Sequence, residues 1–283
     1  MMLRNCLRAA CVCVASVAGL AAGAGPAGAQ SPGPGSRTGR GPHVRVELIT
    51  DGPAPGPGMW LGLKFDLDPG WHIYWQNPGD SGGPPEVAWS FPPGTMAAGI
   101  EWPAPERIDI GGLVNYGYHN RVVLPVPVAV AADVRIPQDF TVKASVRWMA
   151  CANLCVPGKA DLVLRLPLNA SERGQVAAWK AAIDGARGQA PKPAPPDWKA
   201  SARSAGDTFV IEVLTGAREA EAVFFPLEVS QVNDSAEKAV TPLAAGVRVA
   251  LRKSSQLAED PGVLRGVLVL PGGRAYTIEA PVR

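Results

Sequence analysis

Apolar and polar residues alternate in short runs along the first half of the chain, and turn sequences separate these runs. Asp68-Pro69-Gly70 and Asn77-Pro78-Gly79-Asp80 are turn sequences of this kind. The expected strands cover residues 43–49, 59–67, 71–75, 87–91, 122–131, 140–150 and 160–168. Because seven short strands in roughly 125 residues are typical of an immunoglobulin-like β-sandwich, we predict that fold here.

The pattern changes once in the middle of the chain. Apolar residues recur at helical spacing from Val176 to Ile183, which predicts one helix over residues 171–186 with Ser171 as its N-cap. The Pro-rich stretch 188–196 predicts an extended, fairly stiff connector. Strand patterns then return at residues 209–214, 222–229, 247–253, 264–270 and 275–280. The sequence therefore predicts an all-β protein, in which a second, smaller β-sandwich follows the first after one linking helix.

The N-terminus has the features of a secretory signal peptide. Residues 1–8 carry two basic residues and no acid, residues 9–24 are small and apolar, and Ala27-Gly28-Ala29 forms an A-x-A cleavage site. Residues 30–41 are polar and rich in Pro and Gly, so we expect a disordered tail there. The predicted order is a signal peptide at 1–29, the tail at 30–41, the first sandwich at 42–168, the helix and linker at 169–196 and the second sandwich at 197–283.

Signal cleavage would leave an almost neutral chain, with 25 basic and 25 acidic residues. This balance gives no support to a nucleic-acid partner. No run of 18 apolar residues follows Gln30, and Pro125 and Pro127 interrupt the longest candidate, so we expect no membrane span after cleavage. An exported, soluble chain belongs in the periplasm or outside the cell, where oxidants act on cysteine pairs.

Two cysteines, Cys151 and Cys155, would remain in the mature chain, within the segment WMACANLCVPG. Residues four apart in a continuous strand lie about 13 Å apart, so residues 152–154 must turn if the two sulfurs are to bond. A hairpin tip or one helical turn would satisfy the distance, and Pro157 is expected to limit strand pairing just beyond Cys155. Closing so short a loop stabilises a fold by about 2 kcal/mol, against about 4.7 kcal/mol for a 100-residue loop. Strained, exposed bridges are also the readily reduced kind, which favours a redox role over a structural one.

The same two thiols can also serve as ligands for a soft metal ion. Together with Met149, and with His119 from another loop, they would suit Cu(I). A C-x3-C spacing matches no strong zinc pattern, however, and a lone histidine is more often a surface residue. We therefore predict no metal site and no cofactor, and keep copper binding as an alternative.

Three segments carry a resemblance to a known family: WHIYWQNPGDSGGPPEVAW at residues 71–89, IEWPAPERIDIGGLVNYGYHNRVVLPVPV at 100–128, and WMACANLCVP at 148–157. In them the chain resembles the N-terminal periplasmic domain of DsbD-type thiol:disulfide interchange proteins, especially the ScsB branch. The resemblance implies a cysteine pair that takes reducing equivalents from a membrane electron carrier, often through a thioredoxin-like domain. The pair then passes them to periplasmic disulfide-containing proteins. The resemblance also implies that Cys155 is the exchanged sulfur and Cys151 the resolving one.

The sequence departs from that family in two ways. DsbD itself spaces its cysteine pair more widely. Full-length relatives continue into transmembrane helices and a thioredoxin-like domain, whereas this sequence ends at Arg283, so we expect the electron donor to be a separate protein. The hypothesis is a thiol:disulfide oxidoreductase, the reductase component of an exchange system. The alternatives are a periplasmic copper-binding or copper-tolerance protein, and a non-catalytic adaptor whose disulfide braces a loop.

In the resembled family, a loop and aromatic side chains shield the cysteine pair until a partner docks. That likeness makes Asp80, in the loop 77–83, and Tyr116 and Tyr118 candidates for capping the pair or docking a partner. These residues also have plain structural explanations, because Asn-Pro-Gly-Asp is a good turn by itself and tyrosines are common in strands. The tryptophans, Trp148 among them, are expected in the core.

Overall fold

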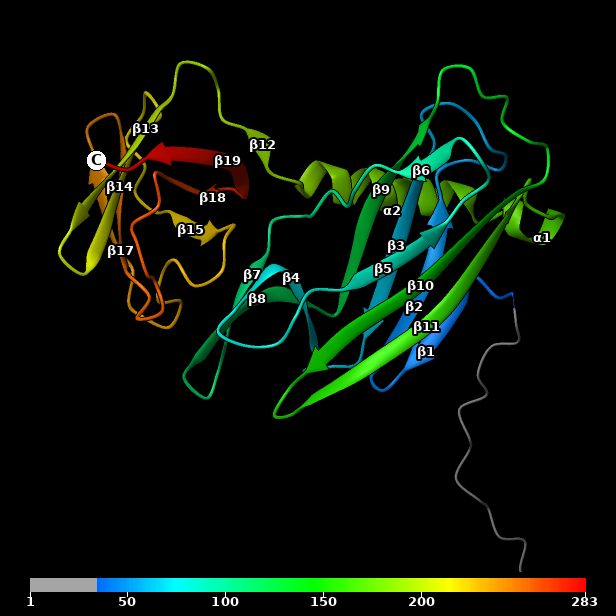
Figure 1. Cartoon of the computed structure of the whole chain (residues 1–283), viewed down its shortest axis with the longest axis horizontal. Coiled ribbons are helices and arrows are strands. Elements are labelled where there is room, and N and C mark those ends of the chain that lie inside the picture. Colours follow the sequence, from blue (N-terminus) through cyan, green and yellow to red (C-terminus); the bar gives the residue numbers. More distant parts are fainter. Residues whose placement is uncertain (1–34) are drawn as a thin grey trace, which may run out of the picture. The chain divides into compact units, whose positions relative to one another are not determined.

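Antiparallel strands make up most of the regular structure (Figure 1). The computed structural model describes residues 35–283. The predicted signal peptide at 1–29, and residues 30–34 of the predicted tail, lie outside the described residues. The all-β prediction is confirmed: one sandwich ends at Leu166, a helical segment follows, and a second sandwich begins at Lys192.

Two antiparallel sheets face each other in the first sandwich. One sheet has the order β1 (Thr38–Gly41), β2 (Val44–Thr50), β3 (Trp60–Leu67), β9 (Arg121–Val130) and β6 (Thr95–Ala97). The other has the order β11 (Cys155–Leu166), β10 (Phe140–Cys151), β4 (His72–Gly79), β8 (Leu113–His119) and β7 (Glu106–Ile110), with β5 (Glu86–Ser90) beside β10. The inward-facing side chains form one apolar core, in which the rings of Phe65 and Trp148 meet edge to face at 5.9 Å.

Strand β10 shows most clearly the period-two pattern that predicts a sandwich. Its buried residues alternate with half-buried or exposed ones from Phe140 to Ala150. It pairs with β11 along its whole length, with β5 in its middle, and with β4 at Cys151. The apolar alternation of β10 therefore fixes where its last residue, Cys151, lies relative to two other strands.

Part of the expected disordered tail is a strand, which corrects that prediction. Residues 38–41 form β1 and pair with β2. The glycines that suggested disorder allow this packing instead. A Cβ at Gly39 would clash with Ala160 of β11, and one at Gly41 would lie 2.8 Å from the Trp148 ring. Because these side chains are absent, β1 can lie close against the β10–β11 hairpin.

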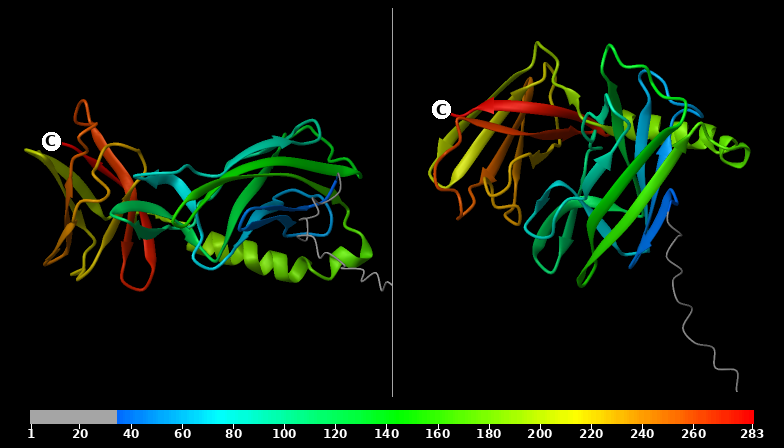
Figure 2. Two further views of the ribbon diagram at one scale, coloured as in Figure 1. Left: turned by 90° about the horizontal axis from the view of Figure 1, so that it is seen from below. Right: turned by 45° about the vertical axis from the view of Figure 1, so that its right-hand side comes forward.

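The helical segment consists of two helices, α1 (Ala170–Arg173) and α2 (Val176–Gln189), where one was predicted. Asn169, rather than Ser171, is the N-cap of α1, and α1 ends at the C-cap Gly174. Helix α2 lies along β2, β3 and β9 (Figure 2). It buries Trp179, Ile183 and Ala186 there.

In the first sandwich, strands β6, β7 and β8 were not predicted from the sequence, and in the second sandwich neither were residues 199–205 and 239–243, which also form strands. In β8, Val114 to Tyr118 are all buried, so the strand has no alternation of buried and exposed residues. Burial on both faces removes the period-two signal that marks a half-buried strand. The Gly111-Gly112 pair joins β7 to β8 as a hairpin turn.

The second sandwich also has two sheets. One has the order β12 (Lys192–Pro193), β19 (Arg274–Pro281), β18 (Val263–Leu270) and β15 (Val223–Pro226). The other has the order β13 (Lys199–Ala205), β14 (Thr208–Leu214), β17 (Gly246–Arg252) and β16 (Ala239–Leu243). The Pro-rich connector contributes β12, which pairs in parallel with β19. Among residues 35–283, no helix is long and apolar enough to cross a membrane.

The two sandwiches share apolar contacts within one compact unit. Phe225, Val267 and Ala275 of the second sandwich join the core cluster of the first. The Phe225 ring lies 6.2 Å from Trp75 of β4 and 5.1 Å from Tyr116 of β8. These contacts explain why β8 is buried on both faces.

The packing of Trp148 can be tested with two matched substitutions of glycine. Gly158 of β11 lies opposite Trp148, and a Cβ there would clash with the indole ring. We expect Gly158→Ala to lower the free energy of unfolding by about 1–3 kcal/mol, because overpacking forces a core side chain to move. Gly185→Ala, on the exposed side of α2 where a Cβ meets no atom, should raise it by about 0.5–1 kcal/mol. Urea unfolding of both variants and of the wild type measures these changes in the free energy of unfolding. If Gly158→Ala is as stable as the wild type, the Trp148 ring moves aside without cost.

Candidate functional site

The two cysteines form a disulfide across the tip of the β10–β11 hairpin. Cys151 is the last residue of β10, Cys155 is the first of β11, and the two lie opposite each other in register with Cα atoms 4.1 Å apart. The Ala152 N–H donates to the Leu154 carbonyl oxygen at 3.1 Å and closes the turn. Of the two geometries that satisfied the spacing, the hairpin tip is the one adopted.

Strand β11 begins earlier than the sequence predicts. Residues 155–159 pair with β10, and Pro157 lies opposite Met149, although we expected this proline to limit pairing. Strand β11 is the edge of its sheet. A proline on an edge strand removes no ladder hydrogen bond when its nitrogen faces outward, which explains the difference.

The two sulfur-bearing side chains differ in their access to solvent. Cys151 is 1% exposed, whereas Cys155 belongs to the exposed residues of the turn. Leu154 beside it is 59% exposed. Cys155 is therefore the more accessible of the two cysteines to a molecule that approaches from solvent.

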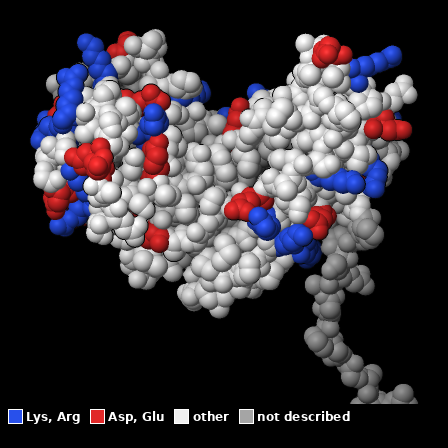
Figure 3. All heavy atoms as spheres, in the orientation of Figure 1, with Lys and Arg blue, Asp and Glu red and all other residues white. Residues whose placement is uncertain are grey.

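The hairpin tip carries no charge of its own. No Lys, Arg, Asp or Glu occurs between Arg147 and Lys159, and Figure 3 shows uncharged surface at the tip of this hairpin. Nearby charges are paired, since Arg147 binds Glu86 at 2.7 Å. No cationic side chain of the hairpin tip itself is therefore available to lower the pKa of a cysteine thiol.

A buried tyrosine provides the polar contact to the sulfurs. The Tyr74 hydroxyl donates to Cys151 Sγ at 2.8 Å and lies 3.6 Å from Cys155 Sγ. Burial raises the pKa of the Tyr74 hydroxyl. The phenol therefore stays protonated and remains a donor at neutral pH. Tyr74 could not be recognised from the sequence as a site residue, because no local pattern shows that β4 lies beside β10.

Residues 77–83, which comprise the end of β4 and the turn after it and which we call the cap loop, cover Tyr74 rather than Cys155. Gly82 has a φ of 80°, and a Cβ at this position would clash with the tip of the Tyr74 ring. The backbone of the cap loop thus lies directly on the phenol, and the Tyr74 side chain is fully buried. Glycine is required here both by the left-handed φ and by the close approach.

The three capping or docking candidates form their hydrogen bonds away from the disulfide. Asp80 accepts from the Val114 N–H at 2.8 Å and from the Ser235 hydroxyl. Tyr116 donates to Asp234 Oδ1 at 2.7 Å, and Tyr118 donates to the Pro103 carbonyl at 2.8 Å. Asp80 belongs to the cap loop, whereas both tyrosines are buried in β8. Their role in capping or docking stays a prediction.

His72 is a second buried residue beside the cysteine pair. It lies opposite Cys151 in the β4–β10 register, and neither of its ring nitrogens has a hydrogen-bond partner within residues 35–283. Its ring meets Tyr74 edge to face at 5.1 Å and lies 5.7 Å from His119. Burial, and secondarily the charge of His119, lowers the pKa of His72 to about 4. The imidazole is therefore neutral at physiological pH.

Two other features of the described residues bear on metal or ligand binding. No group of three or more His, Cys, Asp or Glu side chains in residues 35–283 is arranged to hold a metal ion. His119, the fourth of the ligands that would suit Cu(I), has its Nδ1 2.9 Å from Glu106 Oε2. The copper alternative thus gains no supporting geometry from these side chains.

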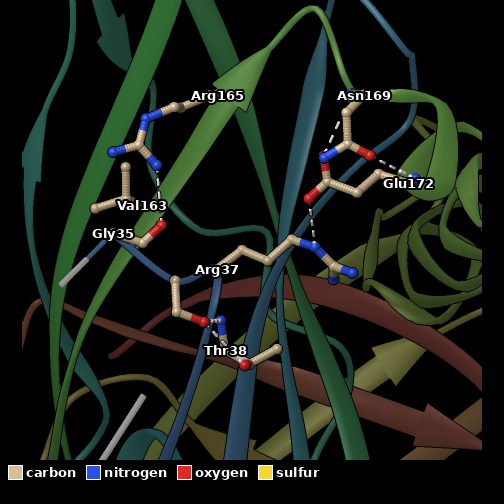
Figure 4. A pocket seen from close by; sticks show the side chains of 8 residues that line it. Gly35, Arg37, Thr38, Val163, Arg165, Asn169 and Glu172 are labelled. Carbon is tan, nitrogen blue, oxygen red and sulfur yellow. Dashed lines mark hydrogen bonds and ion pairs between the residues drawn. The ribbon is translucent and has the colours of Figure 1, made fainter. Parts of the chain in front are cut away.

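A polar cavity lies towards the other end of β11 (Figure 4). Its charged groups already have hydrogen-bond partners: Arg37 binds Glu172 at 3.2 Å, and Arg165 donates to the Gly35 carbonyl at 2.9 Å. Residues ten apart on a strand lie about 33 Å apart, so Arg165 is far from Cys155. This cavity therefore belongs to the packing of β1 and α1 and not to the cysteine site.

Comparison with known proteins shows what the sandwich that carries the cysteine site is similar to. Residues 45–167 match the family "Thiol:disulfide interchange protein DsbD, N-terminal". The N-terminal periplasmic domain of ScsB from Proteus mirabilis is 18% identical, with a TM-score of 0.65 over 86% of this chain and 94% of that one. The reduced N-terminal domain of DsbD from Neisseria meningitidis is 13% identical, with a TM-score of 0.27 over 42% of this chain and 88% of that one. No curated protein matches the sequence. The likeness to the ScsB domain shows a common fold across both sandwiches.

The buried histidine predicts a specific acid sensitivity. The pKa of His72 is about 4 in the folded protein, below the value of about 6.5 for an unfolded chain. Between these pH values the unfolded chain binds more protons, so acidification favours unfolding and stability is lost as the pH falls. In the wild type, we expect this effect to lower the free energy of unfolding by about 3 kcal/mol by pH 4. The His72→Phe variant cannot titrate at this position and should not show this loss.

Urea unfolding of the wild type and His72→Phe at a series of pH values from 7.5 to 4 measures the difference. The comparison uses the slopes of stability against pH, so a constant packing effect of the substitution drops out. Parallel curves would contradict a neutral, buried His72.

Proposed function

We propose, on the premise that residues 45–167 form a domain of the DsbD N-terminal family, that this chain is a thiol:disulfide exchange protein. It passes reducing equivalents through Cys151 and Cys155. The donor is a thioredoxin-like domain or a membrane electron carrier of the DsbD or ScsB type, and the acceptors are periplasmic disulfide-containing proteins. The periplasmic location rests on the predicted signal peptide and on the ScsB domain of Proteus mirabilis, which is a periplasmic domain.

The observation that carries this proposal is the unequal exposure of the two sulfurs in one short hairpin. A disulfide that only braces a fold gains most when it closes a long loop, and this one closes a turn of three intervening residues. An exchange disulfide needs one sulfur that a partner can reach and one that is protected until it must leave. Exposed Cys155 and buried Cys151 meet these two requirements.

The exchange proceeds in two displacement steps. A donor thiolate attacks Cys155 Sγ and forms a mixed disulfide, while the Cys151–Cys155 bond breaks and Cys151 leaves as a thiolate. The second donor thiolate then attacks the donor sulfur of the mixed disulfide and releases Cys155. Two electrons pass to this chain, two protons complete its dithiol, and the donor keeps a disulfide. Reduction of a target runs the same steps in reverse, with Cys155 attacking and Cys151 resolving.

Tyr74 assists the step in which Cys151 leaves. A buried thiolate is unfavourable unless a hydrogen bond satisfies it. The Tyr74 hydroxyl already lies 2.8 Å from Cys151 Sγ, so it donates to the negative charge as soon as the charge forms. Hydrogen bonds to charged groups are worth about 1.5–3 kcal/mol. Because the hairpin tip itself carries no cationic side chain, this donor is the main stabilisation that the site offers to the leaving thiolate.

The assignment of the two cysteines is tested by trapping. Cys151→Ala keeps the exposed thiol and removes the resolving one. The partner is a thioredoxin-like domain that lacks its own resolving cysteine and whose remaining thiol is activated as a mixed disulfide with thionitrobenzoate. Cys155 should attack the sulfur of that domain and expel thionitrobenzoate, so that a stable mixed disulfide accumulates. Cys155→Ala keeps only the buried thiol and should form the adduct at least about tenfold more slowly, because its side chain must first become exposed. Non-reducing gels measure both rates.

Equal trapping by the two variants would overturn the roles given to the cysteines. A mixed disulfide in neither variant, together with a wild-type reduction potential below about −300 mV, would place the bond with structural disulfides and refute the exchange function.

The role of Tyr74 is tested by removing one oxygen atom. Tyr74→Phe keeps the ring under Gly82 but cannot donate to Cys151 Sγ. We expect reduction of the disulfide by dithiothreitol to slow about tenfold, which corresponds to about 1.4 kcal/mol of lost stabilisation. Tyr118→Phe is the matched control, because its hydroxyl is equally buried but donates to the Pro103 carbonyl. Equal rates for Tyr74→Phe and the wild type would exclude the hydroxyl from the leaving step.

A further inference from the structure

We propose that the second sandwich holds the cap loop in place and thereby positions the Tyr74 hydroxyl on Cys151. Asn77 and Asp80 are then positioning residues for the exchange reaction, although neither hydrogen-bonds to a sulfur atom. The inference rests on the proposed function and gives the second sandwich a part in it. It follows from an uninterrupted set of contacts between residues far apart in the sequence.

The first contact is made by Asn77, whose side chain is fully buried. Its Nδ2 donates to the Pro226 carbonyl at 2.9 Å and to the Glu228 carbonyl at 3.3 Å, both in the second sandwich. Its Oδ1 accepts from the Gly79 N–H at 3.0 Å and so forms the turn of the cap loop. One amide group thus joins the start of the cap loop to the second sandwich.

The second contact is made by Asp80 in the middle of the cap loop. Its carboxylate accepts from the hydroxyl of Ser235, which belongs to the second sandwich and also donates to the Gly112 carbonyl at 3.0 Å. The same carboxylate oxygen accepts from the Val114 N–H. Ser235 therefore bridges the cap loop and the β7–β8 turn.

The held loop acts directly on Tyr74. Ser81 donates through its N–H and its hydroxyl to Asn115 Oδ1, at 3.1 and 3.0 Å. The backbone of Gly82 then packs on the tip of the Tyr74 ring. Release of the cap loop would remove one wall of the Tyr74 site, and the hydroxyl would lose its fixed position on Cys151 Sγ.

The second sandwich is anchored firmly enough to serve as the support. Lys238 Nζ donates to the Tyr116 hydroxyl at 2.7 Å, and that hydroxyl donates to Asp234. Beside this network, Phe225 packs against Trp75 and Tyr116. Polar and apolar contacts between the two sandwiches thus surround the cap-loop anchors.

The direction of the effect follows from the exposure of Cys155. The cap loop does not bury the attacked sulfur, so releasing it gives a donor little new access. Release removes the fixed donor to the leaving thiolate instead. Weakening the hold of the second sandwich should therefore slow reduction of the disulfide.

The test uses an exposed residue of the second sandwich. We expect Ser235→Ala to slow reduction by dithiothreitol about threefold to tenfold, the change expected from loss of one hydrogen bond. Ser235→Thr keeps the hydroxyl and should restore the rate. Ser204→Ala, whose hydroxyl accepts from Lys253 within the second sandwich, is the matched control and should react like the wild type.

A second variant and a double mutant separate positioning from general destabilisation. Asn77→Asp keeps the acceptor for Gly79 but cannot donate to the two carbonyls, and it should slow reduction as Ser235→Ala does. In a Tyr74→Phe background, Ser235→Ala should have no further effect, because the group that it positions is gone. A merely structural role would slow both backgrounds equally.

Three results would overturn the proposal: an unchanged rate in Ser235→Ala, an equal slowing in the Tyr74→Phe background, or a faster rate, which would make the cap loop a shield. If Asn77→Asp does not fold, the exposed Ser235 still decides the question. These reduction rates are measured with dithiothreitol, a small thiol, rather than with a protein partner. Failure of the exchange function would appear separately, as absence of a mixed disulfide with a thioredoxin-like domain.

Discussion

The register of β10 is the constraint on which the cysteine site depends. Strand β10 pairs with β11 along its length and meets β4 at its last residue, so one alignment sets three relationships at once. It turns Trp148 into the core, places Cys151 opposite Cys155, and brings Cys151 next to the strand that carries Tyr74. A slip by one residue would turn the buried face of β10 outward and separate the cysteines. The apolar residues that stabilise the sandwich therefore also position the sulfur chemistry.

Much of this arrangement could be read from the sequence, because a half-buried strand shows its alternation locally. The strands around Phe65 and Trp148 were found in this way, and the cysteine spacing limited the turn to two geometries. The sequence did not predict β8, because the second sandwich covers its other face and removes the alternation of buried and exposed residues. The sequence did not predict β1 either, because glycines suggest disorder. Only the structure shows that Ala160 and Trp148 pack against them.

The site itself was only partly predictable, because its contacts join distant parts of the chain. The two cysteines were evident from composition. Tyr74 lies 77 positions before Cys151, and Asp80 lies 155 positions before Ser235, so no local pattern could pair them. His72 gave no signal either, because its burial results from the pairing of β4 with β10 and β8. Resemblance to a family directed attention to the cap loop, but the structure was needed to show that this loop lies on Tyr74.

The uncharged tip of the β10–β11 hairpin has a consequence for how a partner arrives. Electrostatic steering needs an excess of one sign of charge near the contact point, and its effect on association rates falls steeply with ionic strength. Here the residues around Cys155 are apolar or neutral, and the nearest charges are paired with one another. In the proposed exchange, a partner would thus find Cys155 by short-range fit, and its rate of encounter would depend little on the salt concentration of the surrounding medium.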